Sequence, residues 1–171
     1  FIAVSCIANA AAEKPNVIVI MADDLGYGDV SCYGATAFET PHIDKLAAEG
    51  VRFTSGYCSA STCTPTRYSF LTGTYAFRGE RTGIAPPSAP AVIKPGVETV
   101  ASILQRGGYK TAVIGKWHLG WNFDSIRKQG AQKGDPRAKS YDWNKRLTGG
   151  PLDQGFDYYF GDGTINFPPY C

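Results

Sequence analysis

The sequence predicts an α/β fold with a mostly parallel sheet, because strand and helix patterns alternate along the chain. Residues 16–22 (NVIVIMA) form an apolar, β-branched run without polar alternation, which is typical of a strand covered on both faces. The runs at 51–57 and 109–115 are also expected to be strands. Between these runs, residues 40–50 and 98–106 place their apolar side chains on one helical face.

Cap and turn residues set the bounds of these elements. Thr40 suits a helix N-cap, Pro41 suits the first helical position, and Gly50 ends that helix. Gly107 and Gly108 stop the second helix before the strand at 109–115. The two helices are therefore expected to connect successive strands of one sheet.

Polar side chains follow two of the expected strands. Asp23 and Asp24 come directly after the run at 16–22, and Lys116 and His118 come directly after the run at 109–115. In open α/β sheets, ligands bind outside the carboxyl ends of the strands. The sequence therefore predicts a site at that edge, although a solvated turn or loop would also explain each pair alone.

Composition excludes several classes of protein. Apolar residues make up 43% and charged residues 19% of the 171 residues, as in ordinary globular proteins, so a disordered chain is excluded. The formal net charge of +2 gives no support for nucleic acid as a partner. None of the five cysteines forms a C-x-x-C pair, which disfavours structural zinc and thioredoxin-like chemistry.

The first twelve residues, Phe1 to Ala12, are apolar and small and resemble the end of a secretory signal peptide. Ala8-Asn9-Ala10 suits a cleavage site, and the stretch is too short to span a bilayer. We expect residues 1–12 to be a signal remnant and residues 13–171 to be one incomplete catalytic domain. The chain is then expected to be exported, without stable membrane insertion, and Cys32, Cys58 or Cys171 are candidates for disulfides.

The segment from Trp121 to Gly150 is polar and basic. Seven cations, including Arg127, Lys128, Lys133 and Lys139, stand against three aspartates, an excess of four positive charges. We expect an excursion from the sheet. A solvated surface insertion explains it, and electrostatic attraction of a polyanionic substrate is the functional alternative.

The most informative stretch is CTPTRYSFLTG, residues 63–73. Pro65 is tolerated early in a helix and Gly73 can end one, so Cys63 is expected at the positive end of a helix. Arg67, four residues later, shares a face with the first turn. A cysteine in this setting is a candidate activated nucleophile, while a buried structural cysteine is an equally good interpretation of the residue pattern alone.

CTPTR matches the C-x-P-x-R motif of type I, formylglycine-dependent sulfatases, and the chain resembles that family in further blocks. These are PNVIVIMADDLGYGDVSCYG (15–34), TPHIDKLAAEGVRFTSGYC (40–58), GYKTAVIGKWHLG (108–120) and GFDYYFG (155–161). The blocks follow in the order the family shows. The resemblance implies an alkaline-phosphatase-like α/β fold, with a mostly parallel sheet and helices on both faces, of which only the amino-terminal part is present.

The resemblance also implies roles for individual residues. Cys63 matches the residue oxidised to formylglycine, the catalytic aldehyde, which is implied to bind the metal when hydrated. Asp23 and Asp24 match aspartates that bind a divalent cation, usually calcium, and hard carboxylate oxygens suit calcium or magnesium. Arg67 matches the arginine that stabilises the formylglycine. Lys116 matches a lysine that holds the sulfate, and His118 matches a histidine that hydrogen-bonds the formylglycine hydroxyl.

The implied activity is hydrolysis of sulfate esters, either sulfated glycans or small aryl sulfates. The implied partners are this substrate and a formylglycine-generating maturation enzyme, and the implied location is secreted, periplasmic or lysosomal. The family's later histidine, metal-binding pair and second lysine have no match, so we expect the chain alone to be inactive. A phosphate or phosphonate ester hydrolase of the same superfamily and a non-catalytic remnant are the alternatives.

Overall fold

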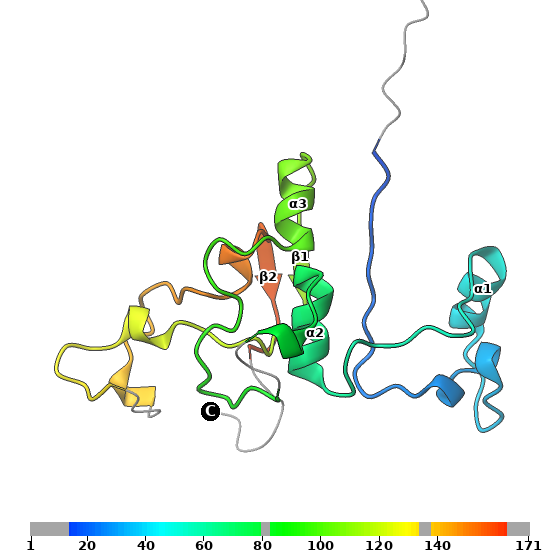
Figure 1. The fold of residues 1–171 in the computed structure, drawn as a ribbon, viewed down its shortest axis with the longest axis horizontal. Coiled ribbons are helices and arrows are strands. Elements are labelled where there is room, and N and C mark those ends of the chain that lie inside the picture. Colours follow the sequence, from blue (N-terminus) through cyan, green and yellow to red (C-terminus); the bar gives the residue numbers. More distant parts are fainter. Residues whose placement is uncertain (1–13, 80–82, 134–137, 164–171) are drawn as a thin grey trace, which may run out of the picture. The chain divides into compact units, whose positions relative to one another are not determined.

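The structure is a computed structural model that describes residues 14–79, 83–133 and 138–163. The expected signal remnant, Phe1 to Ala12, and Cys171 lie outside the described residues. The chain divides into two compact units, residues 1–53 and 54–171, and each is described by itself (Figure 1).

The first unit contains the helix predicted after Thr40. Helix α1 spans Pro41–Glu49, with Thr40 and Gly50 at its ends as expected. A side-chain network holds its start: the Ser31 hydroxyl donates to Asp44 Oδ2 at 2.6 Å, and the backbone N–H of Thr40 donates to Ser31 Oγ at 2.8 Å. Donation by Ser31 lowers the pKa of the Asp44 carboxyl below its ordinary value, so the carboxylate is retained near neutral pH.

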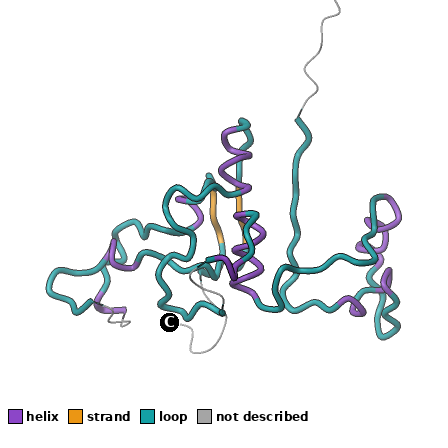
Figure 2. Tube along the Cα trace, viewed as in Figure 1, coloured by secondary structure: helices purple, strands orange, loops and turns teal. Residues whose placement is uncertain are grey.

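The strands predicted over residues 16–22 and 51–57 do not form, so these two predictions are wrong for this structure. Residues 14–22 are instead extended without ladder hydrogen bonds (Figure 2), and Ile18 and Ile20 are each 83% exposed. A strand needs a neighbour to accept and donate its backbone hydrogen bonds. Among the described residues no strand pairs with either segment.

The first unit also has 3-10 turns at Tyr27–Asp29 and Ser31–Tyr33, and the second unit contains the other α-helices and the sheet. Helix α2 spans Cys63–Thr72 and α3 spans Val100–Arg106, close to the two predicted helices. The α3 start is capped by Thr99, whose hydroxyl accepts from the N–H of Ser102 at 3.0 Å. Short 3-10 turns lie at Ala76–Arg78, Phe123–Ile126, Ala138–Ser140 and Pro151–Asp153.

The sheet is parallel, as predicted, but small. Strand β1 (Ala112–Ile114) lies within the predicted run at 109–115, and it pairs with β2 (Tyr158–Phe160) in the register Ala112 to Tyr158. The GFDYYFG block, which contains β2, lies more than forty residues after β1 in the sequence. This separation is consistent with their pairing, because two parallel strands must be joined by a long crossover connection. The described residues thus form a partial α/β structure, without the large sheet covered by helices on both faces.

Trp121 to Gly150 forms an excursion, as expected, but it is not wholly solvated. Ile126 is fully buried and Tyr141 is 5% exposed. Isolated bridges pair Asn122 with Thr148 and Arg127 with Tyr141 in antiparallel fashion. We call the described residues 122–133 and 138–148 the basic hairpin, which is drawn mainly in yellow in Figure 1.

The core of the second unit includes the segment that follows β1. Leu71 of α2, Ile93, Trp117 and Leu119 form its buried centre. Tyr68, Trp121 and Tyr159 pack around them. This core therefore joins α2, which carries Cys63 and Arg67, to the KWHLG block, which carries Lys116 and His118.

Candidate active site

Cys63 is the first residue of α2, at the position predicted for it. Thr62 precedes the helix in an extended conformation, and Gly73 ends it in the left-handed region at φ 65°, with its N–H bonded to Ser69 O. The amide groups of the first turn have no acceptor within the helix, and the aligned peptide dipoles make this end positive. The position of Cys63 therefore favours an anion or an attacking oxyanion.

Two contacts tie α2 to the segment that follows β1. Arg67 Nη1 donates to the backbone oxygen of Lys116 at 2.6 Å, and Thr64 Oγ1 donates to the backbone oxygen of His118 at 3.0 Å. Both contacts join residues about fifty positions apart in the sequence. They bring Cys63, Arg67, Lys116 and His118 into one region of the second unit.

The segment from Lys116 to Gly120 continues the line of β1 beyond the sheet. Gly115 N–H donates to Phe160 O at 2.9 Å, and Trp117 N–H donates to Asp162 O at 2.7 Å, so residues after β2 run beside it. Lys116 and His118 consequently follow the carboxyl end of a parallel strand, which is where α/β sheets place their sites.

His118 is held in an unusual backbone conformation. Its φ is 53°, in the left-handed region, and it is 1% exposed. Its Nε2 lies 2.8 Å from the backbone oxygen of Ala85. Because a carbonyl oxygen only accepts, the neutral ring carries its proton on Nε2, and Nδ1 is the basic nitrogen. Strain of this kind persists where the surroundings fix it, and such positions cluster at functional sites.

Close packing of the backbone supports this conformation. Trp117 Nε1 donates to Gly120 O at 3.1 Å, and Val92 N–H donates to Leu119 O at 2.8 Å. Gly120 has φ 70°, and a Cβ there would lie 2.2 Å from Pro90 O. A side chain at position 120 would therefore force the loop at 83–93 away from the KWHLG segment.

Thr64 is the residue that the sequence interpretation passed over. It is 1% exposed, and its hydroxyl accepts from the Ala85 N–H at 3.0 Å while donating to His118 O. The backbone oxygen of Ala85 also accepts from the His118 ring. The Thr64 hydroxyl and the Ala85 backbone therefore join the start of α2, the loop that contains Ala85 and the segment that contains His118. We call Thr64, Ala85 and His118 the threonine clamp. Its only sequence signal was a threonine beside Cys63, and nothing in the sequence marked Ala85.

Asp23 and Asp24 belong to the first unit, whereas Cys63 belongs to the second. Both aspartates are exposed and follow the extended segment 14–22, and Asp24 has φ 57°, which Asp tolerates better than most residues. Their oxygens suit calcium or magnesium in chemical type. Within residues 14–79, 83–133 and 138–163, no group of three or more His, Cys, Asp or Glu side chains gathers to hold a metal.

Cys32, Cys58 and Cys63 are all unbridged in the structure. Cys63 is half-buried and Cys58 is exposed. No helix in the described part of the chain combines the length and apolarity that a membrane crossing requires.

Comparison with known proteins identifies the family of the chain. A protein-family profile described as Sulfatase matches residues 15–168. The chain is 46% identical over 149 residues to an N-acetylgalactosamine-6-O-sulfatase of Bacteroides thetaiotaomicron, covering 87% of this chain and 26% of that protein. It is 42% identical over 159 residues to human Arylsulfatase D, covering 89% of this chain and 24% of that protein.

A solved structure is similar in fold, and its description refers to the metabolism of multiple glycosaminoglycans by Bacteroides thetaiotaomicron. Its TM-score is 0.73 at 45% identity, over 88% of this chain and 28% of that one. The chain thus spans about a quarter of the length of the curated relatives it matches. Because the profile matches most of the chain and the relatives are more than 40% identical over nearly nine tenths of it, the chain belongs to the sulfatase family.

Proposed function

We propose that this chain carries the nucleophile-bearing part of a hydrolase that cleaves sulfate esters through a formylglycine made from Cys63. The observation that carries the proposal is the joining of the α2 start to the Lys116–His118 segment by Thr64 and Arg67. Family membership supports the same reaction class. The complete sheet of the alkaline-phosphatase-like fold is part of this proposal.

Formylglycine, when hydrated, would supply one hydroxyl whose oxygen replaces the ester alcohol on sulfur, so that the alcohol leaves with a proton, and a second hydroxyl whose deprotonation would re-form the aldehyde and release sulfate. The chain's own residues prepare the position for this chemistry. The first-turn amides of α2 and the nearby Arg67 favour negative charge on the oxygen at position 63. The Lys116 ammonium adds a positive charge for the sulfate oxygens.

His118 manages a proton in the proposed reaction. The bond from Nε2 to Ala85 O leaves Nδ1 as the nitrogen that accepts a proton and returns it. The threonine clamp fixes the backbone of His118 relative to the start of α2. The imidazole and residue 63 therefore keep a constant relative position in the proposed reaction.

A divalent cation would be held in part by Asp23 and Asp24, and it would supply Lewis-acid charge for the sulfate oxygens. Calcium takes about 6–8 oxygen ligands, so the two aspartates make up only part of the shell. The two aspartates therefore fit such a cation by the chemical type of their oxygen ligands.

The experiment is to co-express the full-length gene product with a formylglycine-generating enzyme and compare aryl sulfate with aryl phosphate turnover. We expect sulfate hydrolysis to exceed phosphate hydrolysis, and Cys63→Ala to abolish it. A preference for phosphate or phosphonate would assign the chain to another ester, and full activity of Cys63→Ala would overturn the proposed nucleophile.

We further propose that the chain is exported, on the composition of Phe1 to Ala12. Amino-terminal sequencing of the protein from its native source tests this. A mature start at Ala11 supports cleavage after Ala8-Asn9-Ala10, and retention of Phe1 contradicts it.

A further inference from the structure

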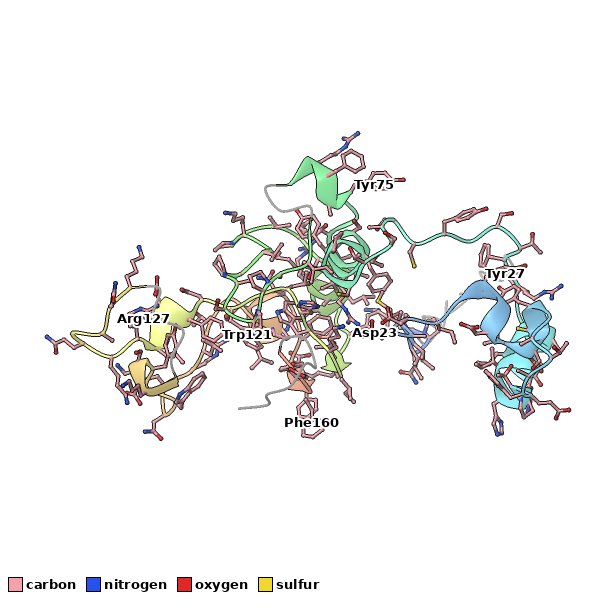
Figure 3. All side chains as sticks on the ribbon, turned by 90° about the horizontal axis from the view of Figure 1, so that it is seen from below. Asp23, Tyr27, Tyr75, Trp121, Arg127 and Phe160 are labelled. Atoms are coloured by element: carbon pink, nitrogen blue, oxygen red, sulfur yellow. The ribbon has the colours of Figure 1, made fainter. Side chains whose placement is uncertain are left out.

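The basic hairpin is a structured element with its own interior. Arg127 lies over the Tyr141 ring, 5.0 Å from its centroid, and its side chain is 12% exposed. Its Nε donates to Asp124 Oδ1 at 2.8 Å, and its Nη1 donates to Gln132 O at 2.8 Å. Arg127 therefore holds the hairpin together, and its charge is committed to that structural role (Figure 3).

Among the described residues of the hairpin region, three carboxylates are paired. Asp124 pairs with Arg127 at 2.6 Å, Asp142 with Lys145 at 3.8 Å, and the neighbouring Asp153 with Arg146 at 2.5 Å. Pairing cancels these charges locally. The positive excess of the segment therefore lies on other side chains.

Three exposed lysines contribute to that excess. Lys128, Lys133 and Lys139 pair with no carboxylate among the described residues. Lys128 N–H donates to Ser140 O at 3.0 Å, so the backbone of Lys128 lies opposite Ser140, the residue that follows Lys139. Lys133 lies in the connection between these two arms.

An exposed indole lies on the same element. Trp143 is 58% exposed and packs its ring against Tyr141 at 5.6 Å between centroids, with an interplanar angle of 64°. Tyr141 is itself buried under Arg127 and Phe123. The indole is thus held in place while much of its surface faces solvent. A fixed, partly apolar ring is suited to the C–H face of a sugar.

The hairpin begins directly after the site segment. Trp121 follows Gly120, packs on the core beside Trp117, and donates from Nε1 to Gly163 O at 3.2 Å. The hairpin is therefore covalently continuous with the segment that carries Lys116 and His118. The structure places this element in the same unit as Cys63.

We propose that the basic hairpin binds the extended part of a sulfated glycan chain, with Trp143 against a sugar ring and Lys128, Lys133 and Lys139 beside its sulfate groups. This inference rests on the proposed function and names its substrate as polymeric rather than a small aryl ester. The whole chain's net charge of +2 and the few cations involved disfavour nucleic acid, which binds broad basic surfaces.

The test uses the full-length protein with Lys128, Lys133 and Lys139 all changed to Gln. The matched control changes Lys45, Arg106 and Lys110 to Gln, which removes the same charge outside the hairpin. Affinity for chondroitin sulfate chains is measured by calorimetry at low and high salt, beside kcat/KM for chondroitin sulfate and for a small aryl sulfate.

We expect the hairpin variant to bind the polymer roughly tenfold more weakly at low salt, the combined effect of three exposed charge contacts, with a smaller difference at high salt. Its aryl sulfate turnover stays that of wild type, and the control variant matches wild type on both substrates. Trp143→Ala lowers polymer affinity at both salt concentrations, and Trp143→Phe restores part of it.

Equal polymer affinity for the hairpin variant and wild type would overturn the inference, as would equal losses in the two triple variants. Equal or tighter binding of double-stranded DNA would also overturn it, in favour of a nucleic-acid surface. If no protein turns over aryl sulfate, the proposed function fails, while the calorimetric comparison still decides the hairpin inference separately.

Discussion

Replacing Thr64 by Val tests whether the threonine clamp holds the nucleophile helix against the histidine segment. Valine keeps the shape of threonine and removes only the hydroxyl. The change deletes two hydrogen bonds, from Thr64 Oγ1 to His118 O and from the Ala85 N–H to Thr64 Oγ1, both 3.0 Å long. Each bond contributes about 1 kcal/mol net, and the buried Ala85 N–H is left without this acceptor.

The expected loss is therefore about 2–3 kcal/mol in the free energy that keeps the clamp closed. This corresponds to roughly a 30- to 150-fold faster exchange of the Ala85 amide if that amide exchanges by local opening. Hydrogen exchange with mass spectrometry on the full-length protein measures it. Thr64→Ser retains the hydroxyl and serves as the matched control, with exchange close to that of wild type.

The same variants separate positioning from folding. With conversion of Cys63 checked by mass spectrometry, Thr64→Val is expected to lower kcat more than it raises KM, because the helix and His118 lose their fixed relation. Unchanged exchange at Ala85, or equal effects of Thr64→Val and Thr64→Ser, would refute the role assigned to the clamp.

Three further predictions concern pH, metal and the extent of the chain. Hydrogen bonds from the Thr111 backbone N–H and from Gln105 lower the pKa of the Asp157 carboxyl in the folded protein. The ionised carboxyl therefore contributes its full stabilisation above the unfolded-state pKa of about 3.9, and this contribution is lost as the pH falls through the lower folded-state pKa. The melting temperature of Asp157→Asn should lie below that of wild type at neutral pH, with the difference closing in acid; a gap that widens in acid would reverse the sign. Changing Asp23 and Asp24 together to Asn should weaken calcium binding in calorimetry and lower kcat/KM by about 100-fold or more, whereas wild-type values for both would remove the aspartates from the metal site. The 171-residue chain expressed alone, with calcium and a maturation enzyme, is expected to release no sulfate above background, because the described residues supply an incomplete metal shell; turnover near that of the full-length product would contradict this.

Local sequence signals predicted the helices well. Thr40 and Pro41 marked the start of α1, and Gly73 marked the end of α2, because cap residues act within a few positions of the bond they satisfy. The strand predictions depended on partners instead. Residues 16–22 have a strand composition but no paired neighbour among the described residues, whereas residues 112–114 pair with β2. Periodicity cannot distinguish these two cases, because pairing is non-local.

The sequence predicted the candidate catalytic residues better than it predicted the contacts that hold them in place. The CTPTR stretch located Cys63 at a helix start, and the KWHLG block located Lys116 and His118 after a strand. The contacts that join them run through backbone oxygens, which any residue supplies, so the sequence carries no mark of Ala85. Charge counting likewise grouped Arg127 with the exposed lysines, although its guanidinium is committed to Asp124 and Tyr141.

The most direct test of the account is the chemical state of residue 63 in active enzyme. Tryptic cleavage after Arg52 and Arg67 releases a peptide, residues 53–67, that contains both Cys58 and Cys63. After alkylation, we predict one alkylated cysteine, at Cys58, and loss of sulfur with gain of an aldehyde oxygen at position 63. Two alkylated cysteines in a fully active, homogeneous preparation would contradict the formylglycine nucleophile, and with it the central claim.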